Sequence, residues 1–348
     1  MRYRHGYGYY GGSNLLRIIS GKYRGKKLAP PPQSSGIRPT TDRAKEAVFN
    51  ILFDKIEGGV FLDLFSGSGA IGIEALSRGA KKVYFVDSDE RSIDLIKRNL
   101  KGIEGEYRIL NMDFQKAVNY LKDSGRKIDI AYCDPPYTKN MGTKIVESVA
   151  NSRILNYSGV LVIERNKEFE KADSEILEHY DTRIYALSAF DFYRRQKRCA
   201  ITGTFDPFTK GHLDLVNKAK ELFDKVYIVI LRNEKKVARY SLEKRKEIIK
   251  VALKNNFDKA VIDSYDGLTI DYCNNNDIQY ILRGVRNFHD MSYEQEMAEY
   301  NYKNGGVTTL IMPARNSEIS STAVKENIDK HSDISAFVDE DIIKILKE

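Results

Sequence analysis

The hydrophobic pattern of the first half consists of short apolar runs separated by segments of helical periodicity. The apolar runs lie at 60–64, 82–86, 107–110, 128–133 and 160–164, and a last extended stretch covers 183–193. Between runs, apolar residues recur at three- and four-residue spacing, as in Ile93, Ile96 and Leu100. Strands that alternate with helices predict a mostly parallel, doubly wound α/β sheet whose ligands bind at the carboxyl ends of the strands.

The second half repeats this alternation with different loops. Extended runs are expected at 200–201, 225–231, 280–282 and 309–312, and helices at 212–222, 241–254, 292–301 and from 320 onward. No sequence repeat links the two halves. The fold class we predict is therefore α/β with two doubly wound, Rossmann-like domains, at 17–195 and 196–348. Only about four residues, 194–197, separate the closing strand of one from the opening strand of the other.

The N-terminal segment has a different character. Residues 1–16 are rich in Tyr, Gly and Arg and show no periodicity, so we expect a disordered extension or a tag there. Residues 17–28 alternate enough for a short hairpin that carries basic side chains. Three prolines at 30–32 favour an extended path, and Thr41-Asp42 can cap a helix that runs through Phe53.

Length and composition indicate a protein of the cytoplasm. A chain of 348 residues accommodates two domains, and 42% hydrophobic with 30% charged residues is ordinary for globular proteins. No run of 18 apolar residues and no signal-peptide core is present. Cys133, Cys199 and Cys273 lie far apart and lack metal-ligand spacing, which fits a reducing compartment and predicts no metal site.

The positive charge is concentrated at the N-terminus. The formal net charge is +7, yet residues 201–348 contain 22 Lys and Arg against 24 Asp and Glu. Residues 1–41 contain eight Lys and Arg and no acid. Such an arm suits a nucleic-acid backbone, although a basic arm can also be no more than a solvated tail.

A glycine-rich loop follows the first apolar run. Gly67-Ser-Gly-Ala-Ile-Gly72 matches G-x-G-x-x-G, and Asp87 follows about twenty residues later. A dinucleotide is disfavoured, because Asp63 on the entering strand would repel its pyrophosphate. The same carboxylate suits a cofactor with an amino group and a sulfonium. Asp87 is placed for ribose hydroxyls and Asp113-Phe114 for adenine, unless each Asp only caps a helix or a turn.

The segment Asp134-Pro-Pro-Tyr137 comes directly after a buried strand. The lone pair of an exocyclic base amine is delocalised into the ring. If the Asp134 carboxylate and the Pro135 carbonyl accept its two hydrogens, that pair is localised toward a methyl donor. The prolines stiffen the loop, and Tyr137 can stack on a flipped-out base. A capped, proline-rich turn is the structural alternative.

Residues from about 17 to 195 resemble the bacterial 16S rRNA (guanine-N2)-methyltransferases. The resemblance is carried by Arg38-Pro-Thr-Thr-Asp-Arg43, Asp63 to Ala80 and Asp134-Pro-Pro-Tyr137. It implies S-adenosyl-L-methionine as cofactor and 16S rRNA or the assembling small subunit as partner. The candidate residues of this half fall into three groups. The cofactor is expected at Asp63, Ser66, Gly67, Gly69, Asp87, Asp113 and Phe114, and catalysis at Asp134, Pro135 and Tyr137. RNA is expected at the basic residues Arg17, Lys22, Arg24, Lys26, Lys27, Arg38 and Arg43. An adenine-N6 methyltransferase and an inactive rRNA-binding module remain alternatives.

The second glycine-containing loop is Gly203-Thr-Phe-Asp-Pro207, followed by Gly211-His212. Backbone N–H groups of such a loop approach phosphates, and His212 lies near a helix start that favours anions. A phosphate nucleophile needs no general base, so catalysis would be positioning and charge stabilisation. His212, Lys236, Arg283 and Arg286 would supply it.

Residues 197–348 resemble phosphopantetheine adenylyltransferase of the coenzyme A pathway. The further residues that carry this likeness are Asp266-Gly-Leu268, Leu282 to Arg286, Asp290, Tyr293-Glu294, Ile319 to Thr322 and Val324-Lys325. By resemblance, 4′-phosphopantetheine is held by Thr204, Lys236, Thr269 and Arg283. ATP, with Mg²⁺ on its phosphates, is held by Thr204, Phe205, His212, Gly284, Arg286, Glu294, Ser320, Ser321 and Thr322. The resemblance also implies a homo-oligomer, a hexamer, through this domain.

One segment departs from the family's pattern. Residues 232–240 lack the two prolines that usually flank the lysine pair. An alignment from Ser241 backwards selects Lys236 as the catalytic lysine, and Lys235 stays open. An adenylyltransferase for another acceptor, such as nicotinamide mononucleotide or a phospho-alcohol, also stays open.

Overall fold

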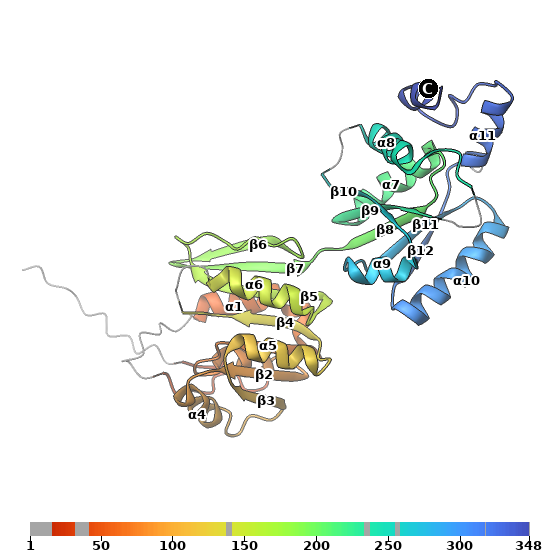
Figure 1. Ribbon diagram of the computed structural model, residues 1–348. Coiled ribbons are helices and arrows are strands. Elements are labelled where there is room, and N and C mark those ends of the chain that lie inside the picture. The colour runs from red at the N-terminus through yellow and green to blue at the C-terminus, as the bar shows by residue number, and fades with distance from the viewer. Residues whose placement is uncertain are drawn as a thin grey trace, which may run out of the picture. The chain divides into compact units, whose positions relative to one another are not determined.

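The computed structural model describes residues 16–31, 42–136, 141–232, 237–254, 258–316 and 318–347. The chain divides into two compact units, Met1–Arg195 and Gln196–Glu348, and each builds its own sheet (Figure 1). No helix in the described part of the chain is both long enough and apolar enough to cross a membrane.

The first unit is a seven-stranded α/β layer structure. Its strands are β1 (Val60–Leu64), β2 (Lys82–Asp87), β3 (Glu106–Asn111), β4 (Ile128–Cys133), β5 (Leu155–Asn166), β6 (Leu177–Tyr185) and β7 (Ser188–Arg195). Its helices are α1 (Asp42–Ile51), α2 (Phe53–Ile56), α3 (Ala70–Ser77), α4 (Glu90–Asn99), α5 (Phe114–Asp123) and α6 (Met141–Ser152).

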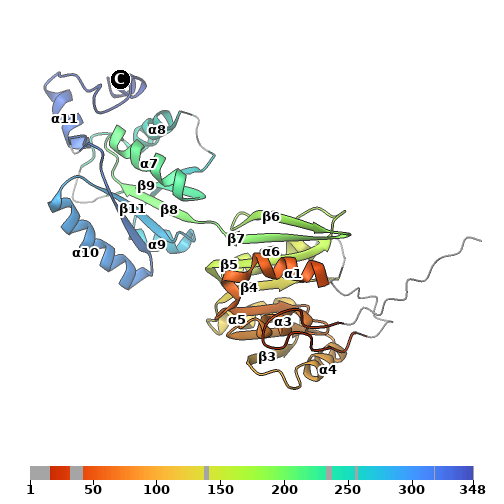
Figure 2. The same cartoon turned by 180° about the vertical axis from the view of Figure 1, so that it is seen from behind.

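The strand order of this sheet is β3-β2-β1-β4-β5-β7-β6. Strands β1 to β5 pair in parallel, and β7 pairs antiparallel with both β5 and β6. One buried cluster packs α1, α3 and α4 on one face, and a second packs α5 and α6 on the other (Figures 1 and 2). Parallel pairing brings the carboxyl ends of β1, β2, β4 and β5 to one edge of the sheet.

Three predicted elements of this unit need correction. The segment 17–28 is a series of turns closed by a single antiparallel bridge, Arg17 with Lys27, rather than a hairpin of two strands. The helix expected from 42 to 53 is two helices, because Leu52 leaves the helical conformation at φ −89°, ψ 0°. The late strand expected at 183–193 is β6 and β7, because Ala186 adopts a left-handed φ of 55° and reverses the chain.

The second unit has five strands and six helices within the described ranges. The strands are β8 (Arg198–Gly203), β9 (Lys225–Leu231), β10 (Ala260–Tyr265), β11 (Tyr280–Val285) and β12 (Thr308–Pro313). The helices are α7 (Lys210–Leu222), α8 (Leu242–Leu253), α9 (Thr269–Asn275), α10 (Phe288–Gly305), α11 (Ser321–Asp329) and α12 (Glu340–Lys347). Helix α10 is longer than the 292–301 that its sequence predicted, because Asn287 caps it, its side chain accepting from the Asp290 N–H.

All five strands run parallel in the order β10-β9-β8-β11-β12. The chain leaves the central strand β8 toward β9 on one side and returns as β11 on the other. Such a reversal of strand order opens a crevice at the carboxyl ends of the two central strands. The doubly wound α/β fold predicted for both halves is therefore confirmed, with the first sheet mixed and the second fully parallel.

Candidate active sites

The glycine loop of the first unit joins β1 to α3. Gly67 and Gly69 adopt φ values of 53° and 76°, which side chains other than glycine rarely accept. At Gly72 a Cβ atom would stand 2.3 Å from the Phe85 ring, so glycine lets α3 approach β2. Ser66 was expected to contact the cofactor, but its hydroxyl donates to the Asp63 carbonyl at 2.6 Å and accepts from the Val86 N–H at 2.9 Å. That side chain therefore holds the loop in shape.

The carboxylates of Asp63 and Asp87 accept hydrogen bonds from backbone N–H groups of this loop and of the start of α3. The Asp63 carboxylate is 2% exposed and accepts from the Gly72 N–H at 2.9 Å. Burial, followed by the charge of Asp87, raises its pKa to about 7, although the Gly72 N–H opposes the shift. Asp87 accepts from the Gly67 N–H at 2.8 Å. The structure thus brings together the two carboxylates that the sequence placed at successive strand ends.

Asp113 and Phe114 follow the third strand. Asp113 caps α5 by accepting from the Gln115 N–H at 2.8 Å, so the helix-cap alternative describes its side chain in this structure. The Phe114 ring is 7% exposed and packs 5.5 Å from the Phe65 ring. An adenine contact would have to use the edge of this ring and the remaining carboxylate oxygen.

Asp134 begins the loop after β4. Burial raises its pKa well above the ordinary carboxyl range, and the charges of Glu164 and Asp63 add to the effect. Pro135 is buried and Pro136 exposed. Tyr137, the proposed stacking residue, lies outside the described residues, as does Arg38.

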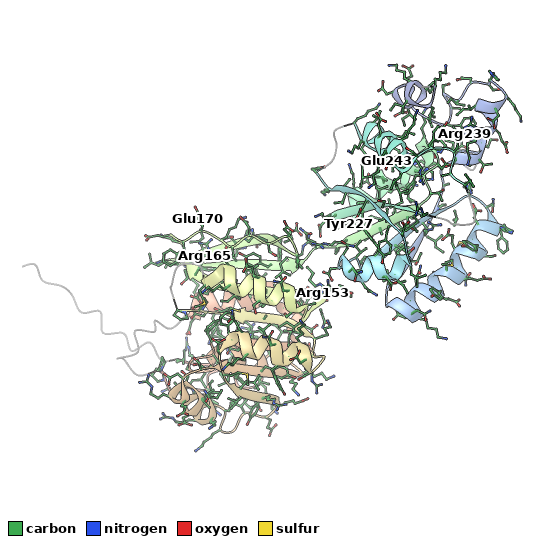
Figure 3. All side chains as sticks on the ribbon, viewed as in Figure 1. Arg153, Arg165, Glu170, Tyr227, Arg239 and Glu243 are labelled. Atoms are coloured by element: carbon green, nitrogen blue, oxygen red, sulfur yellow. The ribbon has the colours of Figure 1, made fainter. Side chains whose placement is uncertain are left out.

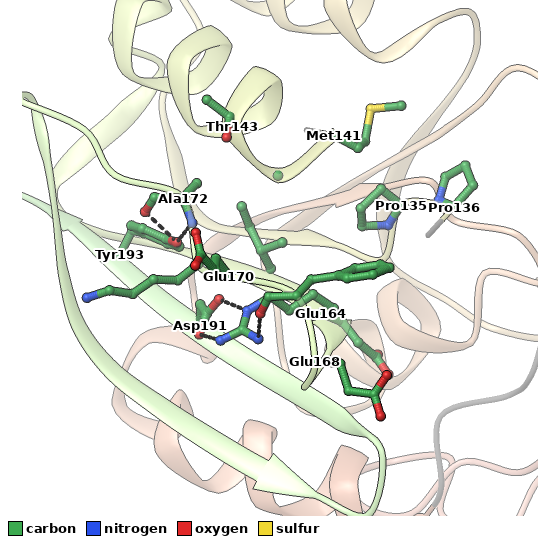
Figure 4. A pocket seen from close by; sticks show the side chains of 15 residues that line it. Pro135, Pro136, Met141, Thr143, Glu164, Glu168, Glu170, Ala172, Asp191 and Tyr193 are labelled. Carbon is green, nitrogen blue, oxygen red and sulfur yellow. Dashed lines mark hydrogen bonds and ion pairs between the residues drawn. The ribbon is translucent and has the colours of Figure 1, made fainter. Parts of the chain in front are cut away.

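A cavity of about 450 Å³ opens beside this loop, within the usual size range of ligand pockets (Figure 4). Figure 4 shows Pro135 and Pro136 at one end of it and Ala172 and Tyr193 at the other. Its lining also includes Met141, Gly142, Thr143, Ile163, Glu164, Arg165, Glu168, Phe169, Glu170, Lys171 and Asp191.

Among these lining residues, the sequence analysis named only Pro135 as a site residue, and two of the others matter for the chemistry. Glu164 stands at the end of an apolar run, as Asp87 and Asp134 do, so the same signal could have identified it. Phe169 lies in the loop after β5 and carried no comparable signal.

The basic segment 16–31 is tied to the body of the first unit through its backbone. Glu74 is fully buried and accepts from the Ile19 and Ser20 N–H groups at 2.8 and 3.0 Å. Asn99 bridges the Ala29 backbone and the Ser68 carbonyl of the glycine loop. Specific hydrogen bonds therefore hold the segment beside the glycine loop.

The basic side chains of this region differ in their partners. Arg17 pairs with Asp42 at 3.0 Å, Lys22 pairs with Glu104 at 2.6 Å, and Lys26 donates to the Lys101 carbonyl. Arg24, Lys27 and Arg43 are exposed and pair with no acid among the described residues. These three are consequently the side chains most available to phosphates.

His212 occupies the first turn of α7 in the second unit. Its Nδ1 accepts from the Thr209 N–H at 3.0 Å, in a capping box. The ring packs against Phe205 and Phe208, with centroids 5.1 and 5.3 Å away. Burial, and then the charges of Arg283 and Arg286, lower its pKa to about 4. Because Nδ1 accepts, the neutral ring carries its proton on Nε2, where it can donate to a ligand.

Two arginines, Arg283 within β11 and Arg286 directly after it, pair with acidic side chains. Arg283 makes a bidentate pair with Glu294, at 2.8 and 2.6 Å, and also donates to the Thr202 carbonyl. Arg286 pairs with Asp290 at 3.0 Å. Glu294, which we expected at ATP, is thus placed as the partner that orients Arg283. Lys235 and Lys236 lie outside the described residues.

The remaining expected nucleotide contacts fall around the same crevice. The Ser321 hydroxyl donates to the Pro207 carbonyl at 2.8 Å, and Ser320 caps α11, which Thr322 continues. Phe205 is 2% exposed, so its ring is core, and the Thr204 carbonyl accepts from Arg245 at 2.8 Å. Gly284 is exposed between the two arginines. Thr269, which was expected to contact phosphopantetheine, is the first residue of α9 and comes after β10 in the chain.

Asp206, which was not among the expected site residues, connects three segments of the second unit. It is 4% exposed, and its two carboxylate oxygens accept from the backbone N–H groups of Arg239 (labelled in Figure 3) and Tyr240, both at 3.0 Å. Lys325 pairs with it at 3.2 Å. One buried carboxylate therefore joins the glycine-containing loop, the segment before α8 and helix α11.

Comparison with known proteins identifies both units. Residues 16–194 match the family described as Conserved hypothetical protein 95, and residues 200–327 match the Cytidylyltransferase-like family. Ribosomal RNA small subunit methyltransferase D of Haemophilus influenzae is 35% identical over 155 residues, 44% of this chain and 80% of the relative.

The second unit has relatives of another name. The phosphopantetheine adenylyltransferase of Coprothermobacter proteolyticus is 39% identical over 151 residues, 42% of this chain and 92% of the relative. That of Frankia casuarinae is 36% identical over 157 residues, 44% of this chain and 97% of the relative. The chain belongs to the Conserved hypothetical protein 95 family through its first unit and to the phosphopantetheine adenylyltransferase family through its second.

Proposed function

We propose that the first unit methylates the exocyclic N2 of a guanine in 16S rRNA, using S-adenosyl-L-methionine. We propose further that the second unit transfers an adenylyl group from ATP to 4′-phosphopantetheine, forming dephospho-coenzyme A and pyrophosphate. The observation that carries the first proposal is the convergence of Asp63, Asp87 and Asp134 on one edge of the sheet. The second is carried by a neutral His212 between the glycine-containing loop and two arginines.

The residues of the first site suit S-adenosyl-L-methionine better than a dinucleotide. A buried carboxylate with a raised pKa, Asp63, gains from a cationic ligand such as an ammonium group. The positive φ of Gly67, with open space where a Cβ would stand, leaves room for a ligand to approach the backbone. Asp87 can share its carboxylate between the Gly67 N–H and a ribose hydroxyl.

The proposed chemistry needs an amine with an available lone pair. Bound S-adenosyl-L-methionine supplies the methyl group: the guanine N2 lone pair forms the N–C bond while the C–S bond breaks toward sulfur, leaving S-adenosylhomocysteine. Asp134 and the Pro135 carbonyl accept the two amine hydrogens and localise the lone pair. One of these protons then passes to Asp134 or to water. Tyr137 is proposed to stack on the base.

The pH dependence of cofactor binding tests the role of Asp63. Because its carboxyl is protonated below about pH 7 and a cationic ligand favours the anion, binding releases a proton. The affinity for S-adenosyl-L-methionine should fall as pH drops below 7, by up to about tenfold per unit. Calorimetry in buffers of different ionisation enthalpy measures the proton released. Asp63→Asn should bind more weakly and lose the dependence, and a pH-independent wild type would contradict this role.

The RNA is proposed to bind the basic segment at Arg17, Lys22, Arg24, Lys26 and Lys27, and to contact Arg38 and Arg43 as well. Replacing Arg24 and Lys27 together by alanine should flatten the salt dependence of rRNA affinity by about one unit per lost phosphate contact. Replacing Arg17 and Lys22 instead should have a smaller effect, because each already pairs with an acid. Filter binding at several salt concentrations measures both slopes, and equal slopes in all three proteins would refute the assignment.

In the second unit, an oxygen of the phosphopantetheine phosphate is proposed to attack the α-phosphorus of ATP. The new P–O bond forms while the bond to the β-phosphate breaks, so pyrophosphate leaves with the electron pair. Nε2 of His212 donates to the α-phosphate oxygen as negative charge accumulates there. Arg283, Lys236, Thr204 and Thr269 are proposed to hold phosphopantetheine.

The proposed ATP contacts are Thr204 and Phe205 through their backbone, His212, Gly284, Arg286, Glu294, Ser320, Ser321 and Thr322. Mg²⁺ would neutralise charge on the ATP phosphates when bound. A homo-oligomer through this unit also remains a prediction. Apolar side chains on α10, including Phe288 at 86% and Tyr302 at 67% exposure, are available for such contacts.

Two assays on the full chain test the proposed functions. Mass spectrometry of small-subunit RNA after incubation with S-adenosyl-L-methionine should find one methylguanine and map its position. Methylated adenine, or no product, would reject the first function. Pyrophosphate release should require 4′-phosphopantetheine, and a faster reaction with nicotinamide mononucleotide or a phospho-alcohol would reject the second.

A further inference from the structure

Glu164, one of the acidic residues that line the cavity, stands next to Asp134 in the sheet. Cys133 on β4 and Ile163 on β5 are register partners in parallel strands, and Asp134 and Glu164 are the next residues of the two strands. Asp134 and Glu164 therefore lie side by side at the carboxyl edge of the sheet, and Glu164 lines the cavity together with Pro135. The charge of Glu164 also contributes to the raised pKa of Asp134, which agrees with this adjacency.

Glu164 is held in a defined orientation. Its side chain is 2% exposed, and the buried Tyr132 hydroxyl donates to its Oε2 at 2.7 Å. A carboxylate has about four lone-pair positions and can accept from several donors at once, so a hydrogen of a ligand can join those that Glu164 already accepts.

The end of β5 and the loop that follows it, which also line the cavity, are held in place as well. Arg165 pairs with the buried Asp191 at 2.5 and 3.1 Å and donates to the carbonyls of Asn166 and Phe169, at 3.2 and 2.5 Å. Arg165 and Glu170, labelled in Figure 3, belong to β5 and the loop that follows it. This loop presents Phe169, 39% exposed, to the cavity. The wall therefore offers an aromatic surface on which a base can stack.

We propose that Glu164 selects guanine as the methylated base by accepting its N1–H while Asp134 and the Pro135 carbonyl hold the N2 amine. Three bases carry an exocyclic amine, and they differ at the neighbouring ring nitrogen. In guanine that nitrogen carries a hydrogen, whereas in adenine and cytosine it carries a lone pair. A carboxylate beside Asp134 attracts the N1–H of guanine and repels the ring-nitrogen lone pair of adenine and of cytosine. This inference rests on the proposed methyltransferase function and extends it to the choice of base.

The test uses 2,6-diaminopurine, which keeps the 2-amino group but has a lone pair at N1. Small-subunit RNA is assembled by ligation so that the methylated position carries guanine or 2,6-diaminopurine, and kcat/KM is measured with the full chain. The wild type should prefer guanine by about 10- to 100-fold, the usual range for one hydrogen bond to a charged group. Glu164→Gln should lower kcat/KM for guanine by a similar factor. It should also reduce the preference for guanine over 2,6-diaminopurine, because the Gln amide can donate a hydrogen bond to the N1 lone pair of 2,6-diaminopurine.

Two further proteins separate specificity from damage to the fold. Glu147→Gln makes the same substitution on the exposed face of α6 and should leave both rates unchanged. Tyr132→Phe removes the hydroxyl that orients Glu164 and should reduce the preference while retaining guanine methylation. Affinity for S-adenosyl-L-methionine should be the same in all variants.

The outcomes also separate this inference from the proposed function. If the wild type methylates guanine and Glu164→Gln keeps the full guanine preference, the assignment of Glu164 is wrong and the function stands. If Glu164→Gln lowers kcat/KM for guanine and for 2,6-diaminopurine by the same factor, Glu164 does not select the base and the inference also fails. Methylation of adenine or cytosine by the wild type would overturn both.

Discussion

Replacing Asp134 by alanine is expected to lower the rate of methyl transfer by on the order of a thousandfold. The substitution removes the acceptor that localises the lone pair of the base amine and takes up its proton, and such groups contribute about 10²–10⁴ to a rate. Binding of S-adenosyl-L-methionine should persist, because the residues proposed to bind it are Asp63, Asp87 and those of the glycine loop. Single-turnover transfer of a labelled methyl group to small-subunit RNA measures the rate, and calorimetry measures the binding.

Two companion variants make this result specific. Asp134→Asn keeps one carbonyl acceptor, so it should stay within about tenfold of the wild type if hydrogen-bond acceptance is what matters. The wild-type rate should rise with pH above the ordinary carboxyl range, because the raised pKa of Asp134 keeps it protonated at lower pH. In Asp134→Asn this rise should disappear. Asp123→Ala, an exposed carboxylate at the end of α5, is the matched control. Wild-type rates in Asp134→Ala would remove this loop from the chemistry.

The second large effect is expected from His212→Ala, which should slow adenylyl transfer by about a hundredfold or more. The Nε2–H of the neutral ring is the proposed donor to the charge that develops on the α-phosphate, and loss of one such donor has this magnitude. The variant also loses the cap on the Thr209 N–H, which costs about 1 kcal/mol of stability. Pyrophosphate release at saturating ATP and phosphopantetheine measures the rate, and thermal unfolding shows whether the fold survives.

The protonation state of His212 gives an independent check. With its pKa lowered from 6.5 to about 4, the ring stays neutral above pH 5, and its contribution to the rate should not change between pH 6 and 8. A rate that falls as pH rises through 6.5 would show a cationic ring instead. The folded protein should also lose stability at low pH through His212, whereas a salt-bridged histidine would add stability there. The free energy of unfolding is unaffected by this group above about pH 6.5 and decreases as the pH falls toward 4, because the unfolded chain binds the proton more tightly than the folded protein.

Measuring both reactions in both variants tests whether the two units work independently. Coupling requires a shared element whose states the two ligands bind differently. The donors and acceptors of the two reactions are unrelated, so we expect none. His212→Ala should leave methyl transfer at the wild-type rate, and Asp134→Ala should leave pyrophosphate release unchanged. His289→Ala, an exposed histidine on α10, should change neither. If the reaction of the unit that carries no substitution slows down while the protein stays folded, the two units are coupled.

The alternation of apolar runs and helical periodicity was sufficient to predict two doubly wound sheets. Residues at strand ends were predictable too, because Asp87 and Asp134 each follow a buried run and Asp63 lies near the end of one, and parallel pairing brings such residues to one edge. Boundaries that depend on one residue's backbone were not predictable. The left-handed Ala186 split one expected strand into two, and Leu52 ended a helix early.

The two families and the glycine loops could be predicted from the amino-acid sequence, because they are local patterns of a few residues. The partners of individual side chains could not be predicted, since they lie far away in the chain. Ser66 hydrogen-bonds to the backbone of β1 and β2, and Glu294 pairs with Arg283. Asp113 caps the start of its own helix. Glu164 gained its place beside Asp134 from strand register, a property of the paired sheet that no single stretch of sequence contains.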